Sequence, residues 1–117
     1  MNFPTDLNGD VFRRMLSAGF DFSRQHDFEF LAVFRTEDEA ERVGQLYLED
    51  HKAGDRLVNI ETRPAQAGGM ELLLVKRMTP TYEAVTAFES RLQARVDTAD
   101  GYLDGWGVLQ PEVKATE

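Results

Sequence analysis

The amino-acid sequence predicts an α+β fold in which an N-terminal helix precedes a β-α-β-β-α-β unit with a four-stranded antiparallel sheet. Three observations support this prediction. Turn residues divide the chain at short intervals, and stretches with apolar residues at helical spacing alternate with stretches of strand length. Two of the strand-length stretches are also apolar on both faces. This order, with two buried central strands, is typical of a ferredoxin-like sandwich.

The first half of the chain supplies a helix, a strand and a second helix. Apolar residues at helical spacing predict a helix over residues 7–18, and Gly19 follows as its stop. Residues 27–35 alternate as a strand with phenylalanine on one face. A capping box at Thr36 then opens an acidic helix over residues 36–50.

The second half supplies two strands, a helix and a last strand. Residues 57–62 alternate as a strand, residues 64–69 form a hairpin connection, and residues 70–78 form the next strand. Pro80 marks the start of a helix whose apolar residues recur at spacings of three and four. Residues 102–109 form the last strand.

The two strands that are apolar on both faces belong in the middle of the sheet. The two helices of the β-α-β-β-α-β unit cover only one of its faces. Leu31, Val33, Leu73 and Val75 therefore need a cover on the other face. The N-terminal helix is the nearest candidate. A homodimer is the alternative, because exposed apolar patches of this size usually mark an interface.

Length and composition indicate one globular domain over residues 1–117, with an ordered core over about 6–109 and a tail over 110–117. The chain contains no cysteine, which excludes disulfides and cysteine zinc sites. No apolar run reaches membrane-spanning length, and no secretory signal is visible at the N-terminus. We therefore expect a cytoplasmic protein that does not interact with membranes.

The formal net charge of −8 argues against direct nucleic-acid binding, because neutralising phosphates requires clustered Lys and Arg. Residues 36–55 carry a net charge of −5, whereas residues 56–78 carry +2. Such polarity can steer a charged partner. Glu37, Asp38 and Glu41 are therefore candidate contacts for a basic protein. The alternative is a solvated helix N-terminus, where the helix dipole alone favours acids.

Motifs for catalysis are missing from the sequence. It has no glycine-rich phosphate loop, no G-x-S-x-G nucleophile motif and no HExxH zinc pattern. The two histidines, His26 and His51, have no partner at a recognised metal-ligand spacing. We therefore expect no catalytic residues, no cofactor and no metal site, and hence a protein that is not an enzyme.

The last strand places the only tryptophan of the chain between two glycines. Regular alternation sends Gly105 and Gly107 to one face and Tyr102, Asp104 and Trp106 to the other. Trp106 then either fills the core or serves as an aromatic anchor at an interface on the edge strand. We treat Asp104 and Trp106 as candidate partner contacts.

The segment Tyr102-Leu103-Asp104-Gly105-Trp106-Gly107 resembles the D-G-W-G ending of the ribonuclease E inhibitor B family. The resemblance extends over residues 7–108, and its other parts are Gly19-Phe20-Asp21 after the first helix, Asp27-Phe28-Glu29-Phe30 in the first strand, and the acidic capped helix. It implies a ferredoxin-like, non-enzymatic regulator that binds ribonuclease E and lowers its RNA-degrading activity. It brings no catalytic residues.

Two functional hypotheses remain. In the first, the chain is a regulatory protein whose acidic helix binds a protein partner, either ribonuclease E or another basic protein. In the second, it is a small-molecule-binding or enzymatic dimeric ferredoxin-like domain, with a pocket between sheet and helices lined by Phe and Tyr. The sequence favours the first, because it contains no convergent His, Cys or Ser constellation.

Overall fold

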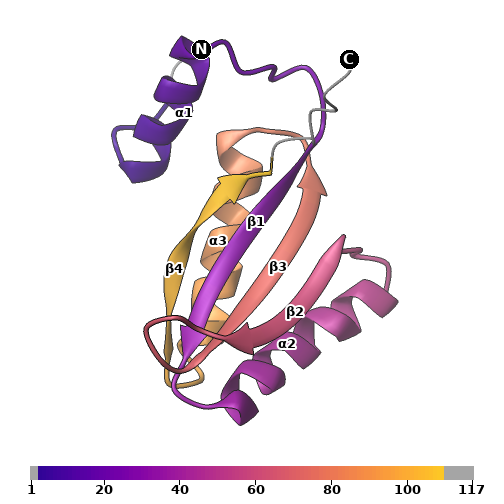
Figure 1. The fold of residues 1–117 in the computed structure, drawn as a ribbon. Helices are drawn as coiled ribbons and strands as arrows, with labels where there is room; N and C mark the ends of the chain where they lie inside the picture. Colours follow the sequence, from indigo (N-terminus) through magenta and orange to yellow (C-terminus); the bar gives the residue numbers. More distant parts are fainter. Residues whose placement is uncertain (1–2, 110–117) are drawn as a thin grey trace, which may run out of the picture.

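The computed structural model describes residues 3–109, and it has the element order that the sequence predicts (Figure 1). The elements are α1 (Leu7–Ser17), β1 (His26–Phe34), α2 (Glu37–Lys52), β2 (Asn59–Pro64), β3 (Met70–Met78), α3 (Tyr82–Val96) and β4 (Gly101–Val108). The predicted α+β fold, an N-terminal helix followed by β-α-β-β-α-β, is therefore confirmed. The predicted tail over 110–117 lies outside the described residues.

The four strands form one antiparallel sheet in the order β2-β3-β1-β4. β1 and β3 are the central strands, as their apolar residues predicted. In Figure 1, α2 and α3 lie behind the sheet, and no described helix lies on its front face. We call this front side, which carries Leu31, Val33, Leu73 and Val75, the open face of the sheet.

Each of the three described helices begins at a side-chain cap, and the caps of α2 and α3 bear on the predicted boundaries. The Thr36 hydroxyl accepts the backbone N–H of Glu39 at 3.3 Å, as the predicted capping box requires. In α3, Thr81 is the cap and accepts the N–H of Ala84 at 3.0 Å. The helix therefore begins after Thr81 and not at Pro80, because the threonine side chain satisfies a backbone donor of the first turn.

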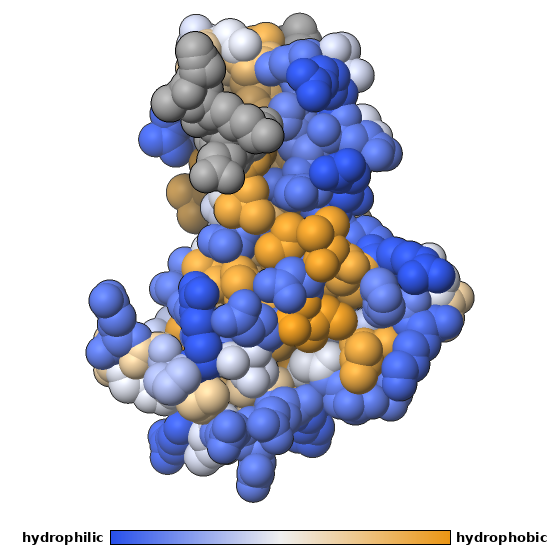
Figure 2. Space-filling model, turned by 45° about the vertical axis from the view of Figure 1, so that its right-hand side comes forward, coloured by the Kyte–Doolittle hydropathy of each residue, from blue (hydrophilic) through white to orange (hydrophobic). Residues whose placement is uncertain are grey.

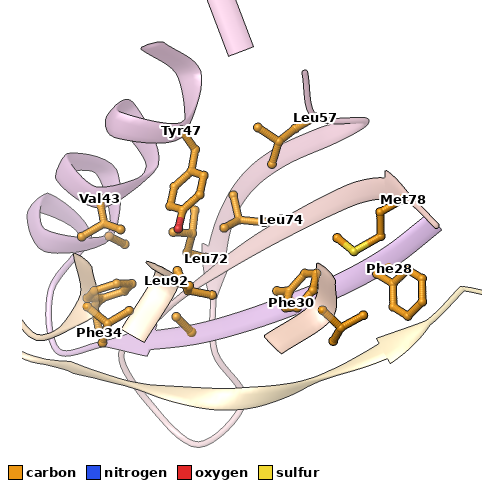
Figure 3. Packing of buried hydrophobic residues seen from close by; sticks show 14 of the residues in the cluster. Phe28, Phe30, Phe34, Val43, Tyr47, Leu57, Leu72, Leu74, Met78 and Leu92 are labelled. Carbon is orange, nitrogen blue, oxygen red and sulfur yellow. The ribbon is translucent and has the colours of Figure 1, made fainter. Parts of the chain in front are cut away.

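The hydrophobic core lies between the helices and the sheet (Figure 3). Phe28, Phe30 and Phe34 on one face of β1 are at most 1% exposed. In Figure 3, Tyr47 of α2 extends toward Leu72 on the sheet. Burying each large side chain contributes about 1.5–3 kcal/mol. These side chains occupy the space in which the second hypothesis placed a small-molecule pocket.

β2 begins two residues later than the sequence predicted. Leu57 lies before the strand and is buried in the core. Its backbone N–H donates to Nδ1 of His51 near the end of α2, at 2.9 Å. The chain is thus tied to the helix before it pairs with β3, and His51 acts as a structural acceptor.

The prediction that the N-terminal helix covers the second sheet face is wrong. α1 packs on the helix side, beside α3 and β4. Phe12 is fully buried, and its ring centroid lies 5.8 Å from that of Trp106. The Asn8 amide donates to Oε1 of Glu89 on α3 at 2.8 Å. Aromatic packing and this polar contact hold α1 away from the open face.

Tyr47 joins α2 to α3 but leaves one polar atom unsatisfied. The guanidinium carbon of Arg95 lies 4.4 Å from the Tyr47 ring centroid, and Nη1 of Arg95 donates to Asp50 at 2.8 Å. The Tyr47 hydroxyl is buried, and no group of residues 3–109 forms a hydrogen bond with it. Burial raises the pKa of Tyr47 to about 12. A buried hydroxyl without a partner costs stability because its desolvation is not compensated.

Replacing Tyr47 by phenylalanine is expected to raise the free energy of unfolding by about 1 kcal/mol, since the uncompensated hydroxyl is removed while the ring remains. Urea unfolding followed by circular dichroism measures this change. Tyr82→Phe is the matched control, because the Tyr82 hydroxyl donates to Asp6. That variant is expected to lower the free energy of unfolding. A destabilised Tyr47→Phe variant would contradict the lack of a partner for this hydroxyl.

Candidate protein-binding surface

The open face of the sheet has an apolar middle and a polar border. Val33, Leu73 and Val75 lie outside the cluster beneath the helices, yet they are only 5–7% exposed. Tyr102, by contrast, is 55% exposed. Figure 2 shows hydrophobic residues gathered near the middle of the molecule and bordered by hydrophilic ones, which is the arrangement of protein interfaces.

The open face is hollowed beneath the connection between β2 and β3. A hollow of about 490 Å³ lies between Pro64 at the end of β2, residues 65–68 of this connection, and Tyr102 and Asp104 of β4, with Val33 below. A second hollow of about 430 Å³ shares Val33 and Tyr102 and continues to Arg35. We call the two hollows together the hairpin groove.

Both arginines that line the hairpin groove are paired with carboxylates. Nε of Arg63 donates to Oε1 of Glu71 at 2.7 Å, which raises the pKa of the Arg63 guanidinium. Nε of Arg35 lies 3.0 Å from Oδ2 of Asp100. Asp104 has no ion-pair partner among residues 3–109. The groove therefore presents one carboxylate that no cation of the described residues neutralises.

The regular alternation predicted for the last strand is wrong, because β4 contains a bulge. The pairing with β1 shifts at Asp104, which has no partner in the register. Gly105, the next residue, has a φ of +139°, a conformation that favours glycine. As a result Tyr102 lies on the open face, whereas Trp106 lies on the helix side.

Trp106 joins α1 to the sheet. Its ring centroid lies 5.9 Å from that of Phe28 and 5.8 Å from that of Phe12. Its Nε1 donates to Oδ1 of Asn8 at 3.0 Å. The side chain is partly buried and packs against the core. The sequence left two roles open for Trp106, a core residue or an aromatic anchor at an interface. These contacts correspond to a core residue.

The acids predicted on the second helix are exposed. Glu37, Asp38 and Glu41 form no ion pair within the described part of the chain. Glu39, which lies among them, accepts the backbone N–H of Asp100 at 3.0 Å, and this bond lowers the pKa of Glu39. The bond holds the first turn of α2 beside the turn that precedes β4, where the hairpin groove ends.

The five predicted contact residues therefore do not form one cluster. Glu37 and Asp38 lie at the end of the sheet that the hairpin groove reaches, and Asp104 lies within the groove. Glu41 instead borders a hollow of about 320 Å³ between α2 and β2. Trp106 lies on the opposite side of the sheet.

Sequence reasoning missed Tyr102 as a residue of the open face, because it assumed regular alternation. A glycine inside a strand often marks a bulge, and Gly105 was the signal that could have placed Tyr102 correctly. The β2–β3 connection was also missed as part of a surface, since nothing in a turn sequence reveals the strand over which it folds.

Residues 3–109 contain no cluster of three or more His, Asp or Glu side chains that could hold a metal ion. No described helix combines the length and the apolar character that crossing a membrane requires.

The two glycines of β4 are expected to respond differently to alanine. Gly105→Ala forces a side chain into a positive φ and is expected to lower the free energy of unfolding by about 1–3 kcal/mol. Gly107→Ala is the control, because its added Cβ meets no atom within 4 Å and its φ lies outside the range that favours glycine. Urea unfolding of both variants measures the difference. Equal losses would contradict the bulge.

Removing the Asn8 side chain is expected to expose the tryptophan. Asn8→Ala deletes the acceptor of the Trp106 Nε1–H and the bonds to α3, at a cost of about 1–3 kcal/mol. Because Trp106 is the only tryptophan, iodide quenching of fluorescence reports on it directly. Quenching is expected to rise in Asn8→Ala and to stay unchanged in Ser17→Ala, a substitution at an exposed position of α1. Unchanged quenching in Asn8→Ala would contradict this role.

A family model described as "Regulator of ribonuclease activity B" matches residues 5–108, which include every helix and strand of the structure. A search of curated proteins finds no match. Regulators of this family are non-enzymatic inhibitors, in agreement with the expectation that the chain is not an enzyme. The chain belongs to the family of regulators of ribonuclease activity B.

Proposed function

We propose that this protein binds ribonuclease E and lowers its RNA-degrading activity, with the exposed acids in the first two turns of α2, Glu37, Asp38 and Glu41, forming part of the contact. The family match over residues 5–108 carries the proposal, because it assigns the chain to regulators of ribonuclease activity. Direct binding to ribonuclease E is the part of the proposal that goes beyond the family match.

The charge of the chain supports a protein contact of this kind. An enzyme that degrades RNA has to hold a phosphate backbone, and it does so with clustered Lys and Arg. A protein of net charge −8 complements such a surface. Glu37, Asp38 and Glu41 are available for this contact, because no cation of residues 3–109 pairs with them.

Asp104 and Trp106 enter the proposal in different ways. Asp104 adds a carboxylate on the open face, near the end of the sheet at which α2 begins. Trp106 supports the surface from behind, since it packs on the other side of β4 and fixes α1 through Asn8. In this proposal Asp104 contacts the partner and Trp106 positions the strand.

Inhibition is tested with purified ribonuclease E and a fluorescent single-stranded RNA substrate. The wild-type protein is expected to lower the cleavage rate. The triple variant Glu37→Gln, Asp38→Asn, Glu41→Gln is expected to need about five- to tenfold more protein for the same inhibition, because exposed ion pairs contribute about 0.2–1 kcal/mol each. Inhibition by the wild type is also expected to weaken as salt screens the charges.

A control variant carries the same change in net charge at exposed positions away from the first two turns of α2: Asp21→Asn, Glu49→Gln, Glu83→Gln. It is expected to inhibit like the wild type. Equal weakening of both variants would show that net charge, and not the position of the acids on α2, governs inhibition. No inhibition and no binding by the wild type would reject the proposal itself.

A further inference from the structure

We propose that the hairpin groove binds an extended segment of the partner that carries both basic and apolar side chains. This inference rests on the proposed function only for the identity of the partner, which would be ribonuclease E. The chemistry of the segment follows from the groove itself: an apolar side chain lies over Val33 beside Tyr102, and a Lys or Arg pairs with Asp104.

The apolar part of the groove calls for an apolar group on the partner. Val33 lies in a central strand, and Tyr102, next to it on the edge strand, is 55% exposed. Exposed tyrosines of this kind contribute strongly to protein interfaces, because a rigid ring buries a large area at low entropic cost. Covering Tyr102 would complete a hydrophobic contact that the chain leaves open.

The charged part of the groove calls for cations. Arg63 and Arg35 are each paired with a carboxylate, Glu71 and Asp100 respectively. In the described part of the chain, the groove therefore has no free cation to receive an acidic ligand. Among residues 3–109, Asp104 is the one carboxylate of the groove without an ion-pair partner. Further acids lie at the end of the groove where α2 begins.

The shape of the groove favours an extended segment. Its two hollows share Val33 and Tyr102 and together run from Asp104 to Arg35 beneath the β2–β3 connection. An extended chain can place alternate side chains into such a groove while the others face its rim.

Charge disfavours two other occupants. The open face and the groove carry the acids Asp27, Glu29, Glu61, Glu71, Asp100 and Asp104 against the bases Arg35, Arg63 and Arg77. This surplus of acids would make two copies of the face repel one another, which disfavours the homodimer considered from the sequence. It would also repel the phosphates of RNA.

The groove is tested first without ribonuclease E. Two synthetic peptides serve as probes: Lys-Leu-Lys-Phe-Lys-Leu-Lys and the same peptide with Glu in place of each Lys. In ¹H–¹⁵N NMR titrations of the full chain, the basic peptide is expected to shift the amides of Val33, Tyr102 and Asp104, and the acidic peptide is expected to shift none. Shifts confined to the helix side, or equal effects of both peptides, would overturn the inference.

The second measurement uses immobilised ribonuclease E. Tyr102→Ala is expected to weaken binding about tenfold, as for a buried aromatic anchor. Asp104→Lys is expected to weaken it by a similar factor and to flatten its salt dependence. Leu16→Ala and Glu49→Lys, at exposed positions outside the groove, are the matched controls and are expected to bind like the wild type.

The outcomes separate the two proposals. If the wild type does not bind ribonuclease E but the basic peptide occupies the groove, the proposed partner is rejected and the inference about the groove is supported. If the wild type binds but Tyr102→Ala and Asp104→Lys bind equally well, the inference about the groove is rejected and the proposed function is kept. A dimer in sedimentation that Asp104→Lys disrupts, or groove shifts with single-stranded RNA, would overturn the inference in favour of those occupants.

Discussion

β1 is the strand on which the rest of the structure depends, because it pairs along both edges and is apolar on both faces. Its backbone pairs with β3 on one side and with β4 on the other. Phe28 and Phe30 on one face close the core beneath the helices, and Val33 on the other face lies below the hairpin groove. One nine-residue strand thus supports both the stability of the fold and the surface proposed to bind the partner.

The bulge at Asp104 places side chains of β4 with different contacts on the two sides of the sheet. Without the shift in register, Tyr102 and Trp106 would share a face and compete for the same space. With it, Trp106 packs under α1 while Tyr102 stands free on the open face. The unusual glycine-flanked tryptophan is therefore explained mainly by packing. Asp104, two residues before it, is exposed and lines the hairpin groove.

The sequence predicted those features that depend on local periodicity. The spacing of Phe28 and Phe30, the cap at Thr36 and the two-sided hydrophobicity of the central strands led to the correct element order and sheet arrangement. The side of the sheet that α1 occupies could not be predicted, because it depends on Phe12 meeting aromatic rings from distant segments. The bulge at Asp104 was missed because regular alternation was assumed, although Gly105 inside the strand is a signal for a bulge.

The hydrogen bond between Glu39 and the backbone of Asp100 joins residues that are 61 positions apart in the chain. The proposed contact surface is therefore assembled from segments that meet only in the folded state. No short peptide cut from the sequence can reproduce it, and an unfolded chain lacks it. A partner that recognises this surface binds the native state alone, so by mass action its binding also protects the protein against unfolding.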